Sequence, residues 1–337
     1  MAVQQRQRTA RFQPVVQPQP QTLSTAPEAP SRRPGFPPRF TFEPGARIGG
    51  DFTVIGHLSA GNIAELYQVW SAAYICALTC KIILPQFEPR SKEARGLKRE
   101  ATLLRRMAHP NIVHIFGQST HEGREFLIQE YLHGPSLLAL IDASPNRRVH
   151  PPDAMKAVIH ICAALVHLHE RGYIHQDIKP ANVILRGGIP VLVDFDVAYR
   201  LKPGHKPRER SGTDPYMAPE QCLREELSPA TDIYSVGAVL YEMLTGRWLF
   251  EEELLNSPEH HTLEQRYPQI CGSSPPPPRQ FNAQISPDLE AVLMKCLRRN
   301  PRQRFQSARE LAKRLARFLE GTDRLWPESL DLQHTMV

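Results

Sequence analysis

The 337-residue sequence has few cysteines and no long apolar run. No stretch reaches the roughly 18 apolar residues that a membrane-spanning helix needs, and the N-terminus lacks the apolar core of a signal peptide. An uncharged stretch at 69–80 is interpreted as buried strand. The cysteines show neither a C-x-x-C pair nor zinc-ligand spacing, so we expect buried, reduced thiols of a cytoplasmic protein. They are Cys76, Cys80, Cys162, Cys222, Cys271 and Cys296.

The sequence also has no excess of acidic residues, and its formal net charge is +6. Residues 1–47 hold seven Arg against only Glu28 and Glu43, and they are rich in Pro and Gln. Because such a segment cannot bury enough apolar surface to offset its ordering entropy, we expect a disordered tail. Its dispersed arginines could contact nucleic acid or anionic lipid. The lack of interleaved aromatic residues favours a solvated tail, and no nucleic-acid partner is expected.

The sequence pattern changes from mainly strand-like to mainly helical near residue 134. Residues 51–131 contain short β-like runs and one helical segment at 93–107. Later helices are predicted at 154–172, 231–246, 286–300 and 307–321, and the second of these is predicted to begin at an Asp/Thr cap. We therefore expect an α+β protein with a small β-rich lobe carrying one helix, a larger helical lobe, and a ligand cleft between them. The predicted boundaries are a tail at 1–47, lobes at 48–131 and 134–322 within a domain of 48–322, and a second tail at 323–337.

Three polar residues have a spacing that suits phosphoryl transfer. Asp177 and Asn182 lie five residues apart on a loop after an amphipathic helix, and Asp194 follows a short apolar strand twelve residues later. Such a loop and hairpin can direct all three side chains into one pocket. Asn182 and Asp194 offer the hard oxygen ligands that Mg²⁺ prefers, which leaves Asp177 for a substrate hydroxyl and Lys179 for the transferred phosphate.

These residues, the D-F-x triplet at 194–196 and the "APE" of 218–220 together resemble the eukaryotic-type (Hanks-type) Ser/Thr protein kinases, as found in bacteria. The resemblance covers about residues 50–320 and implies the two-lobed protein-kinase-like fold. It also implies transfer of the γ-phosphoryl group of ATP to Ser or Thr hydroxyls of protein substrates, with Mg²⁺ or Mn²⁺ as the metal. Lys179 with Thr213 resembles the Ser/Thr branch rather than the Tyr branch. Arg304 of "NPRQRF" resembles the family's usual partner of the APE glutamate, here Glu220.

The resemblance assigns further roles by position. Lys81 of "LTCK" would contact the α- and β-phosphates and pair with Glu100, although both could otherwise be ordinary surface charges. With Asp177 and Lys179 these residues form the expected catalytic set. The expected metal ligands are Asn182 and Asp194. The other expected nucleotide contacts are Ser59, Gly61, Ala64, Glu130, Leu132 and Ile184.

The phosphate loop and the position before the hinge depart from the family pattern. Of its three usual glycines, only Gly61 remains, since Ser59 and Ala64 occupy the outer positions. Glycine there permits close backbone approach to phosphate, so the substitutions predict weaker ATP affinity. Gln129 falls at the gatekeeper position, where a buried polar side chain needs a partner that the nucleotide could supply.

Two further departures lie in the catalytic and activation segments. Gln176 replaces the Arg that receives an activation-segment phosphate in the family, which predicts no phosphorylation switch through this position. Asp196 replaces the Gly of the D-F-G triplet. Its carboxylate could raise the proton affinity of Asp194, add a metal contact, or point to solvent and only stiffen the loop.

Three functions compete. The first is an active protein kinase, and the second is a pseudokinase that binds nucleotide as a scaffold, which Asp196 and the missing glycines suggest. The third is a small-molecule kinase of the aminoglycoside type, against which Lys179 and the 218–220 segment argue. The basic stretch at 200–210 indicates either acidic substrates or a solvated loop.

Overall fold

A computed structural model describes residues 40–255, 262–271 and 274–320. Residues 1–39 of the first expected tail and all of the second, 323–337, therefore lie outside the described residues. Residues 40–46, which the sequence placed in the first tail, pack against the first lobe. Phe40, Phe42 and Ala46 contact its buried apolar cluster.

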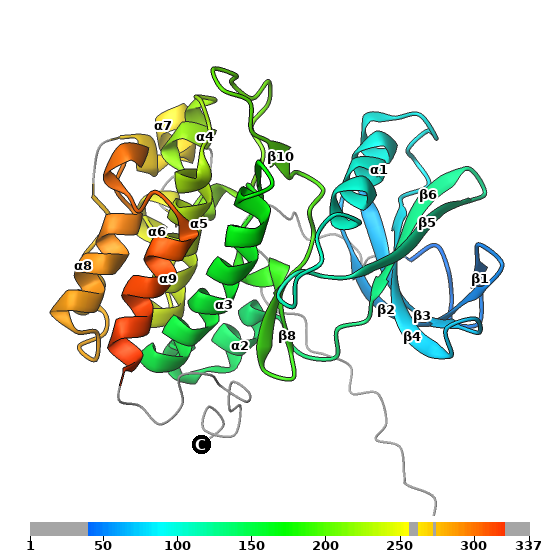
Figure 1. The fold of residues 1–337 in the computed structure, drawn as a ribbon, viewed down its shortest axis with the longest axis horizontal. Coiled ribbons are helices and arrows are strands. Elements are labelled where there is room, and N and C mark those ends of the chain that lie inside the picture. The colour runs from blue at the N-terminus through cyan, green and yellow to red at the C-terminus, as the bar shows by residue number, and fades with distance from the viewer. Residues whose placement is uncertain (1–39, 256–261, 272–273, 321–337) are drawn as a thin grey trace, which may run out of the picture. The chain divides into compact units, whose positions relative to one another are not determined.

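The first lobe is built on a six-stranded antiparallel sheet, and α1 (Lys92–Leu104) lies beside it (Figure 1). The strand order is β1-β2-β3-β4-β6-β5. In β3, buried Tyr67, Val69 and Ser71 alternate with more exposed residues, as expected for a sheet with one covered face. The strands are β1 Arg47–Ile48, β2 Phe52–Ala60, β3 Ala64–Ser71, β4 Cys76–Ile83, β5 Ile115–His121 and β6 Arg124–Glu130.

Helix α1 begins where the sequence supplies a cap. The Ser91 hydroxyl accepts a hydrogen bond from the backbone N–H of Ala94 at 3.1 Å. Leu97, Ala101 and Leu104 are buried at helical spacing, which turns Glu100 to the same side.

The second lobe consists mainly of helices, with two small hairpin-like sheets near the lobe junction. Each sheet has two strands: β7 Tyr173–Ile174 with β10 Tyr199–Arg200, and β8 Val183–Arg186 with β9 Ile189–Leu192. The helices are α2 Leu137–Ala143, α3 Pro151–His169, α4 Pro219–Leu223, α5 Pro229–Thr245, α6 Glu251–Leu255, α7 Leu263–Arg266, α8 Pro287–Cys296 and α9 Ala308–Ala316. The five predicted helices are confirmed as α1, α3, α5, α8 and α9.

Helix α5 is buried on all sides, and its start differs from the prediction. It begins at Pro229 after Ser228, so the predicted Asp/Thr cap is wrong. A proline at the first helical position needs no hydrogen-bond partner for its nitrogen, which favours this earlier start. Gly237 lies where a Cβ atom would come within 2.7 Å of Cys296, so glycine allows α5 and α8 to approach closely.

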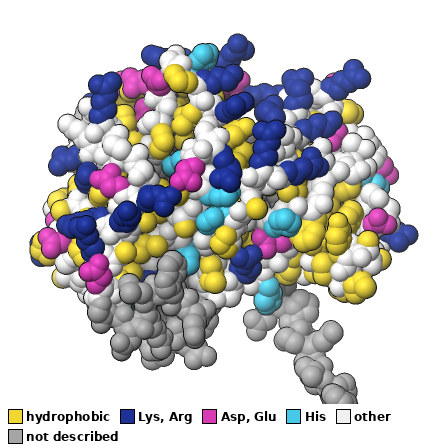
Figure 2. All heavy atoms as spheres, viewed as in Figure 1, with side chains coloured by type: hydrophobic (Ala, Val, Ile, Leu, Met, Phe, Trp, Pro, Cys, Tyr) yellow, Lys and Arg dark blue, Asp and Glu magenta, His cyan; other side chains and the backbone are white. Residues whose placement is uncertain are grey.

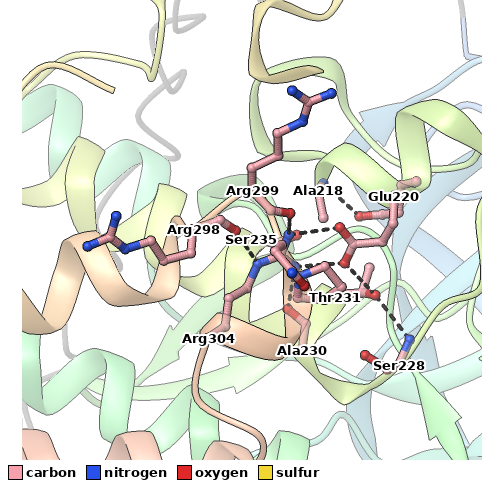
Figure 3. A network of polar contacts seen from close by, with 12 residues as sticks. Ala218, Glu220, Ser228, Ala230, Thr231, Ser235, Arg298, Arg299 and Arg304 are labelled. Carbon is pink, nitrogen blue, oxygen red and sulfur yellow. Dashed lines mark hydrogen bonds and ion pairs between the residues drawn. The ribbon is translucent and has the colours of Figure 1, made fainter. Parts of the chain in front are cut away.

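A bidentate ion pair joins α4 to the loop before α9 (Figure 3). Arg304 donates to both carboxylate oxygens of Glu220, at 2.7 and 2.8 Å, as the sequence predicted. Its remaining donors reach the carbonyl oxygens of Ala230, Arg298 and Arg299. All five guanidinium N–H groups are therefore used inside the protein.

Two sequence expectations need correction. Residues 69–80 do not form one buried strand, because they turn between β3 and β4, and Ile75 in that turn is 77% exposed. All six cysteines are free as predicted, but Cys271 is exposed and Cys76 is half-buried. In the described parts of the chain, every helix is too short or too polar to cross a membrane.

Candidate active site

Lys81 connects the two lobes through two carboxylates. It lies on β4, and its Nζ is 2.8 Å from Glu100 Oε2 on α1 and 2.6 Å from Asp194 Oδ1. Burial alone would lower the pKa of Lys81, but the carboxylates of Asp194 and Glu100 raise it above its usual value, so the amine stays protonated. Burial would raise the pKa of Asp194, but the charge of Lys81 outweighs burial and lowers it.

Asp194 is held by its backbone as well as by Lys81. Its φ is 63°, in the left-handed region that non-glycine residues seldom adopt. The next residue, Phe195, is buried, and its N–H donates to Glu100 Oε1 at 3.2 Å. Glu100 therefore accepts from Lys81 with one oxygen and from Phe195 with the other. This arrangement couples the position of α1 to the position of Asp194.

Asp177 lies at the centre of a second polar cluster. Its Oδ2 accepts from Asn182 Nδ2 at 3.0 Å and lies 2.8 Å from Lys179 Nζ. Its Oδ1 accepts from the Thr213 hydroxyl at 2.7 Å, and Lys179 donates to the same hydroxyl oxygen. The structure thus brings together Asp177, Lys179 and Asn182, as the spacing predicted, and adds Thr213 from the segment before "APE".

Asp232 fixes the backbone of the loop that leads to Asp177, a role that the sequence did not reveal. Its two carboxylate oxygens accept from the backbone N–H groups of His175 and Gln176, both at 2.9 Å. His169 Nε2 also lies 2.8 Å from Asp232 Oδ2. The available signal was an Asp in the first turn of an otherwise apolar helix, where a buried carboxylate needs several donors.

The phosphate loop is the turn between β2 and β3. Gly61 N–H donates to the Ala64 carbonyl at 2.9 Å and closes the turn. Ser59, Gly61 and Ala64 all have φ values outside the left-handed region, so this conformation does not demand glycine at the outer positions. Ala64 is buried, whereas Ser59 and Gly61 are exposed.

The expected nucleotide contacts Glu130, Leu132 and Ile184 lie at the junction of the lobes. Glu130 ends β6, and its carboxylate contacts Arg186 Nη1 at 2.8 Å, so its side chain is already paired. Leu132 is half-buried against the main apolar cluster, and Ile184 is a half-buried residue of β8. Gln129 is 5% exposed, and within the described structure its Nε2 is a buried donor without an acceptor.

Residues 52–315 match the family described as the protein kinase domain. The chain belongs to this family. Among bacterial relatives, it is 27% identical to serine/threonine-protein kinase PrkC of Bacillus subtilis over 79% of this chain and 40% of that protein. It is 33% identical to PknB of Mycolicibacterium smegmatis over 66% of this chain and 36% of that protein. The match therefore spans well under half the length of these relatives.

A solved structure supports the kinase fold. The PknI kinase domain of Mycobacterium tuberculosis superimposes with a TM-score of 0.64 at 22% sequence identity. The superposition covers 82% of this chain and 99% of that one. The predicted α+β fold, with a sheet-based lobe followed by a helical lobe, is confirmed.

In this kinase domain, Gln176 bonds to the start of the activation segment, the residues between β9 and α4, and to α4 itself. Its Nε2 donates to the Val197 carbonyl at 2.6 Å, and its own carbonyl accepts from Gln221 Nε2 at 2.9 Å. Gln221 Nε2 also donates to the Ser211 carbonyl at 3.0 Å. Two neutral amides therefore hold this segment where the family pattern has a charged arginine.

Asp196 is half-buried, and charged groups of the candidate site act on its carboxyl. Burial first, and then the negative charge of Asp194, raise the pKa of Asp196 to about 6, while Lys81 opposes them. The φ of Asp196 is not positive, so its backbone does not need glycine in this conformation.

The basic stretch at 200–210 is exposed. Figure 2 shows Lys and Arg side chains gathered over α1 and the segment that follows β10. Glu209 pairs with Lys92 of α1. Among the described residues, Lys202, Lys206 and Arg208 have no carboxylate partner, so both interpretations of this stretch stay open.

Proposed function

We propose that this chain is an ATP-dependent protein Ser/Thr kinase that transfers a γ-phosphoryl group to protein hydroxyls. The observation that carries the proposal is the simultaneous pairing of Lys81 with Glu100 and Asp194. This arrangement forms only when β4, α1 and the segment after β9 are all correctly placed relative to one another. The names of the bacterial relatives, which are Ser/Thr-protein kinases, support the same activity.

The donor set fits a nucleotide with a divalent metal. Asn182 and Asp194 present amide and carboxylate oxygens, the ligand type that Mg²⁺ prefers, and Mn²⁺ accepts the same ligands. The metal would neutralise charge that develops on the phosphate oxygens. The unpaired amide of Gln129 supplies a further polar group for the base.

The chain's own residues account for the remaining requirements. Asp177 accepts the proton of the substrate hydroxyl, and Asn182 and Thr213 hold its carboxylate in place. Lys179 and Lys81 place positive charge beside the phosphates. Ser59, Gly61 and Ala64 would contact the phosphates, and Glu130, Leu132 and Ile184 would contact the base. Six unpaired cysteines support action in the reducing cytoplasm.

The test uses the full purified chain with labelled ATP, Mg²⁺ or Mn²⁺ and a generic protein substrate. We expect transfer by the unaltered protein and a loss of about 10²- to 10⁴-fold in Asp177→Ala, the range for removal of acid–base assistance. Transfer that does not depend on Asp177 would refute the assignment. The matched control is Arg309→Ala, which breaks an exposed ion pair with Glu170 and should leave transfer unchanged.

A pseudokinase is the second candidate, because Asp196 adds a negative charge beside Asp194. It predicts nucleotide binding without turnover. Thermal unfolding with ATP and metal reports binding in both cases, since ligand at one hundred times its Kd adds about 2.7 kcal/mol to the stability of a kinase or a pseudokinase, and a turnover assay then distinguishes the two. Stabilisation together with Asp177-dependent turnover supports the kinase, and stabilisation alone supports the pseudokinase.

A further inference from the structure

Residues 40–46, which we call the N-terminal strap, lie against the covered face of the first lobe. Thr41 donates to Glu65 Oε1 from its backbone N–H and from its hydroxyl, both at 2.9 Å. The N–H groups of Thr41 and Phe42 also lie 3.0 and 3.1 Å from the Tyr67 hydroxyl oxygen. The strap thus bonds to two residues of β3.

The strap also contacts β2. His57 Nε2 donates to the Phe42 carbonyl at 2.8 Å, and the rings of His57 and Phe40 stack with centroids 4.2 Å apart. His57 pairs with Tyr67 in the sheet, and Ala60 pairs with Glu65. The strap therefore contacts β2 shortly before the phosphate-loop turn and β3 shortly after it.

Glu65 is the charged centre of this attachment. It is 1% exposed, and Arg124 Nη2 contacts its Oε2 at 2.9 Å. A buried carboxylate is costly unless its oxygens are satisfied, and Thr41 supplies the donors for the second oxygen. Arg124 in turn donates to the Ile83 carbonyl and lies 5.2 Å from the Phe42 ring centroid. Deleting the strap would leave Glu65 half-satisfied beside the phosphate loop.

We propose that the N-terminal strap is a positioning element for nucleotide binding, acting through Glu65 and His57 on the phosphate loop. The loop has only Gly61 of the usual glycines and is closed by one backbone hydrogen bond. Fixing its two strands beforehand reduces the ordering that a bound nucleotide must impose. The proposal rests on the proposed function, because its ligand is ATP.

The distinguishing test separates KM for ATP from kcat. Thr41→Val removes the hydroxyl donor but keeps the side-chain shape, and Thr41→Ser restores the donor. We expect Thr41→Val to raise KM for ATP by about 3- to 10-fold, with little change in kcat. This is less than the full effect of one lost hydrogen bond to a charged group, because the Thr41 backbone N–H still donates to Glu65. Thr41→Ser should stay near the unaltered protein. Phe40→Ala, which removes the stack on His57, should act in the same direction.

A stability control excludes a merely structural role. Asn282→Ala removes a buried hydrogen bond to the Leu244 carbonyl in the helical lobe, far in sequence from the strap. It should lower Tm without changing KM for ATP. If Thr41→Val and Phe40→Ala lower Tm but leave KM for ATP unchanged, the proposal is overturned.

Amide hydrogen exchange tests the strap even if the proposed function fails. In the nucleotide-free protein, Thr41→Val should accelerate exchange at residues 57–67 relative to Thr41→Ser. Unchanged protection there would overturn the proposal whether or not the protein transfers phosphate. Faster exchange without any turnover would support the proposed role of the strap and would refute the kinase activity.

Discussion

At the scale of single residues, replacing glycine by Asp196 can affect the site through its backbone conformation or through its charge. Asp194 occupies the left-handed region, whereas Asp196 does not, so the strained position is the one that holds the expected metal ligand. A carboxylate at 196 changes the local charge without requiring a backbone conformation that Asp disfavours.

Asp196→Gly tests whether the backbone at position 196 needs glycine for catalysis. We expect kcat to stay within a few-fold of the unaltered protein, because glycine is not needed to reach the observed conformation. Steady-state phosphoryl transfer measures it, with Asp194→Ala as the inactive control. A rise of an order of magnitude or more would instead mean that Asp196 restrains catalysis.

Gln129 makes a second residue-scale prediction. Its buried Nε2 has no acceptor within the described structure, so Gln129→Met should stabilise the nucleotide-free protein by about 1–3 kcal/mol. Urea unfolding measures the change. The matched control is Gln269→Met, which should destabilise, because Gln269 Nε2 donates to the Asp214 and Met217 carbonyls. Equal effects of both variants would contradict the argument.

At the scale of elements, neutral hydrogen bonds of Gln221 hold part of the activation segment, beside the ion pairs of Glu209 with Lys92 and of Asp214 with Arg266. Gln221 bonds to Gln176 and Ser211, and its Oε1 accepts from the Ala218 N–H at 3.0 Å. Such bonds do not need a phosphate to form. The segment can therefore adopt this arrangement without modification.

Gln221→Ala should loosen the end of the activation segment that leads into α4. We expect a higher KM for protein substrate and a loss of stability of about 1–3 kcal/mol, while KM for ATP stays unchanged. Peptide and ATP titrations measure the two constants separately. A change in KM for ATP alone would place Gln221 in a different role.

Helix α5 holds the loop before Asp177 through hydrogen bonds to Asp232, which gives a pH-dependent prediction. Burial would raise the pKa of Asp232, but hydrogen bonds and charge from His169 and His175 lower it below the ordinary Asp value. A lowered folded-state pKa means that the ionised group stabilises the fold above the unfolded-state pKa. That contribution is lost as the pH falls through the folded-state pKa.

Asp232→Asn removes this contribution. We expect a loss of about 2–4 kcal/mol near pH 7, because the Asn side chain keeps one acceptor oxygen and presents an NH₂ group to the other backbone N–H, which loses its hydrogen bond. The difference from the unaltered protein should shrink below about pH 4, where the unfolded-state carboxyl begins to protonate. Unfolding measured across pH 3–8 tests the trend, and a pH-independent difference would contradict it.

At the scale of the whole molecule, one buried apolar cluster includes residues of both lobes. It contains Leu97 and Leu104 of α1, Leu127 of β6 and Phe195, together with the helices of the second lobe. The polar link from Lys81 to Asp194 therefore lies beside a continuous apolar link. The position of α1 depends on both.

Much of this arrangement could be predicted from the sequence. The short β-like runs and the helical segments that follow them indicated the fold class. The order of Lys81, Glu100, Asp177, Asn182 and Asp194 indicated the candidate site. Periodicity could not reveal Asp232 or Gln221, because their partners are backbone groups distant in sequence. It also misplaced residues 40–46, since isolated aromatic residues in a Pro-rich segment have no period.

The exposed turn between β3 and β4 has a practical consequence. Ile75 has a φ of 54°, a left-handed value that a β-branched side chain disfavours, and its apolar surface is open to water. Asparagine tolerates this backbone and would present a polar surface instead. Ile75→Asn should therefore yield a preparation that can be concentrated further before it precipitates, which would help crystallisation and isotope-labelled spectroscopy.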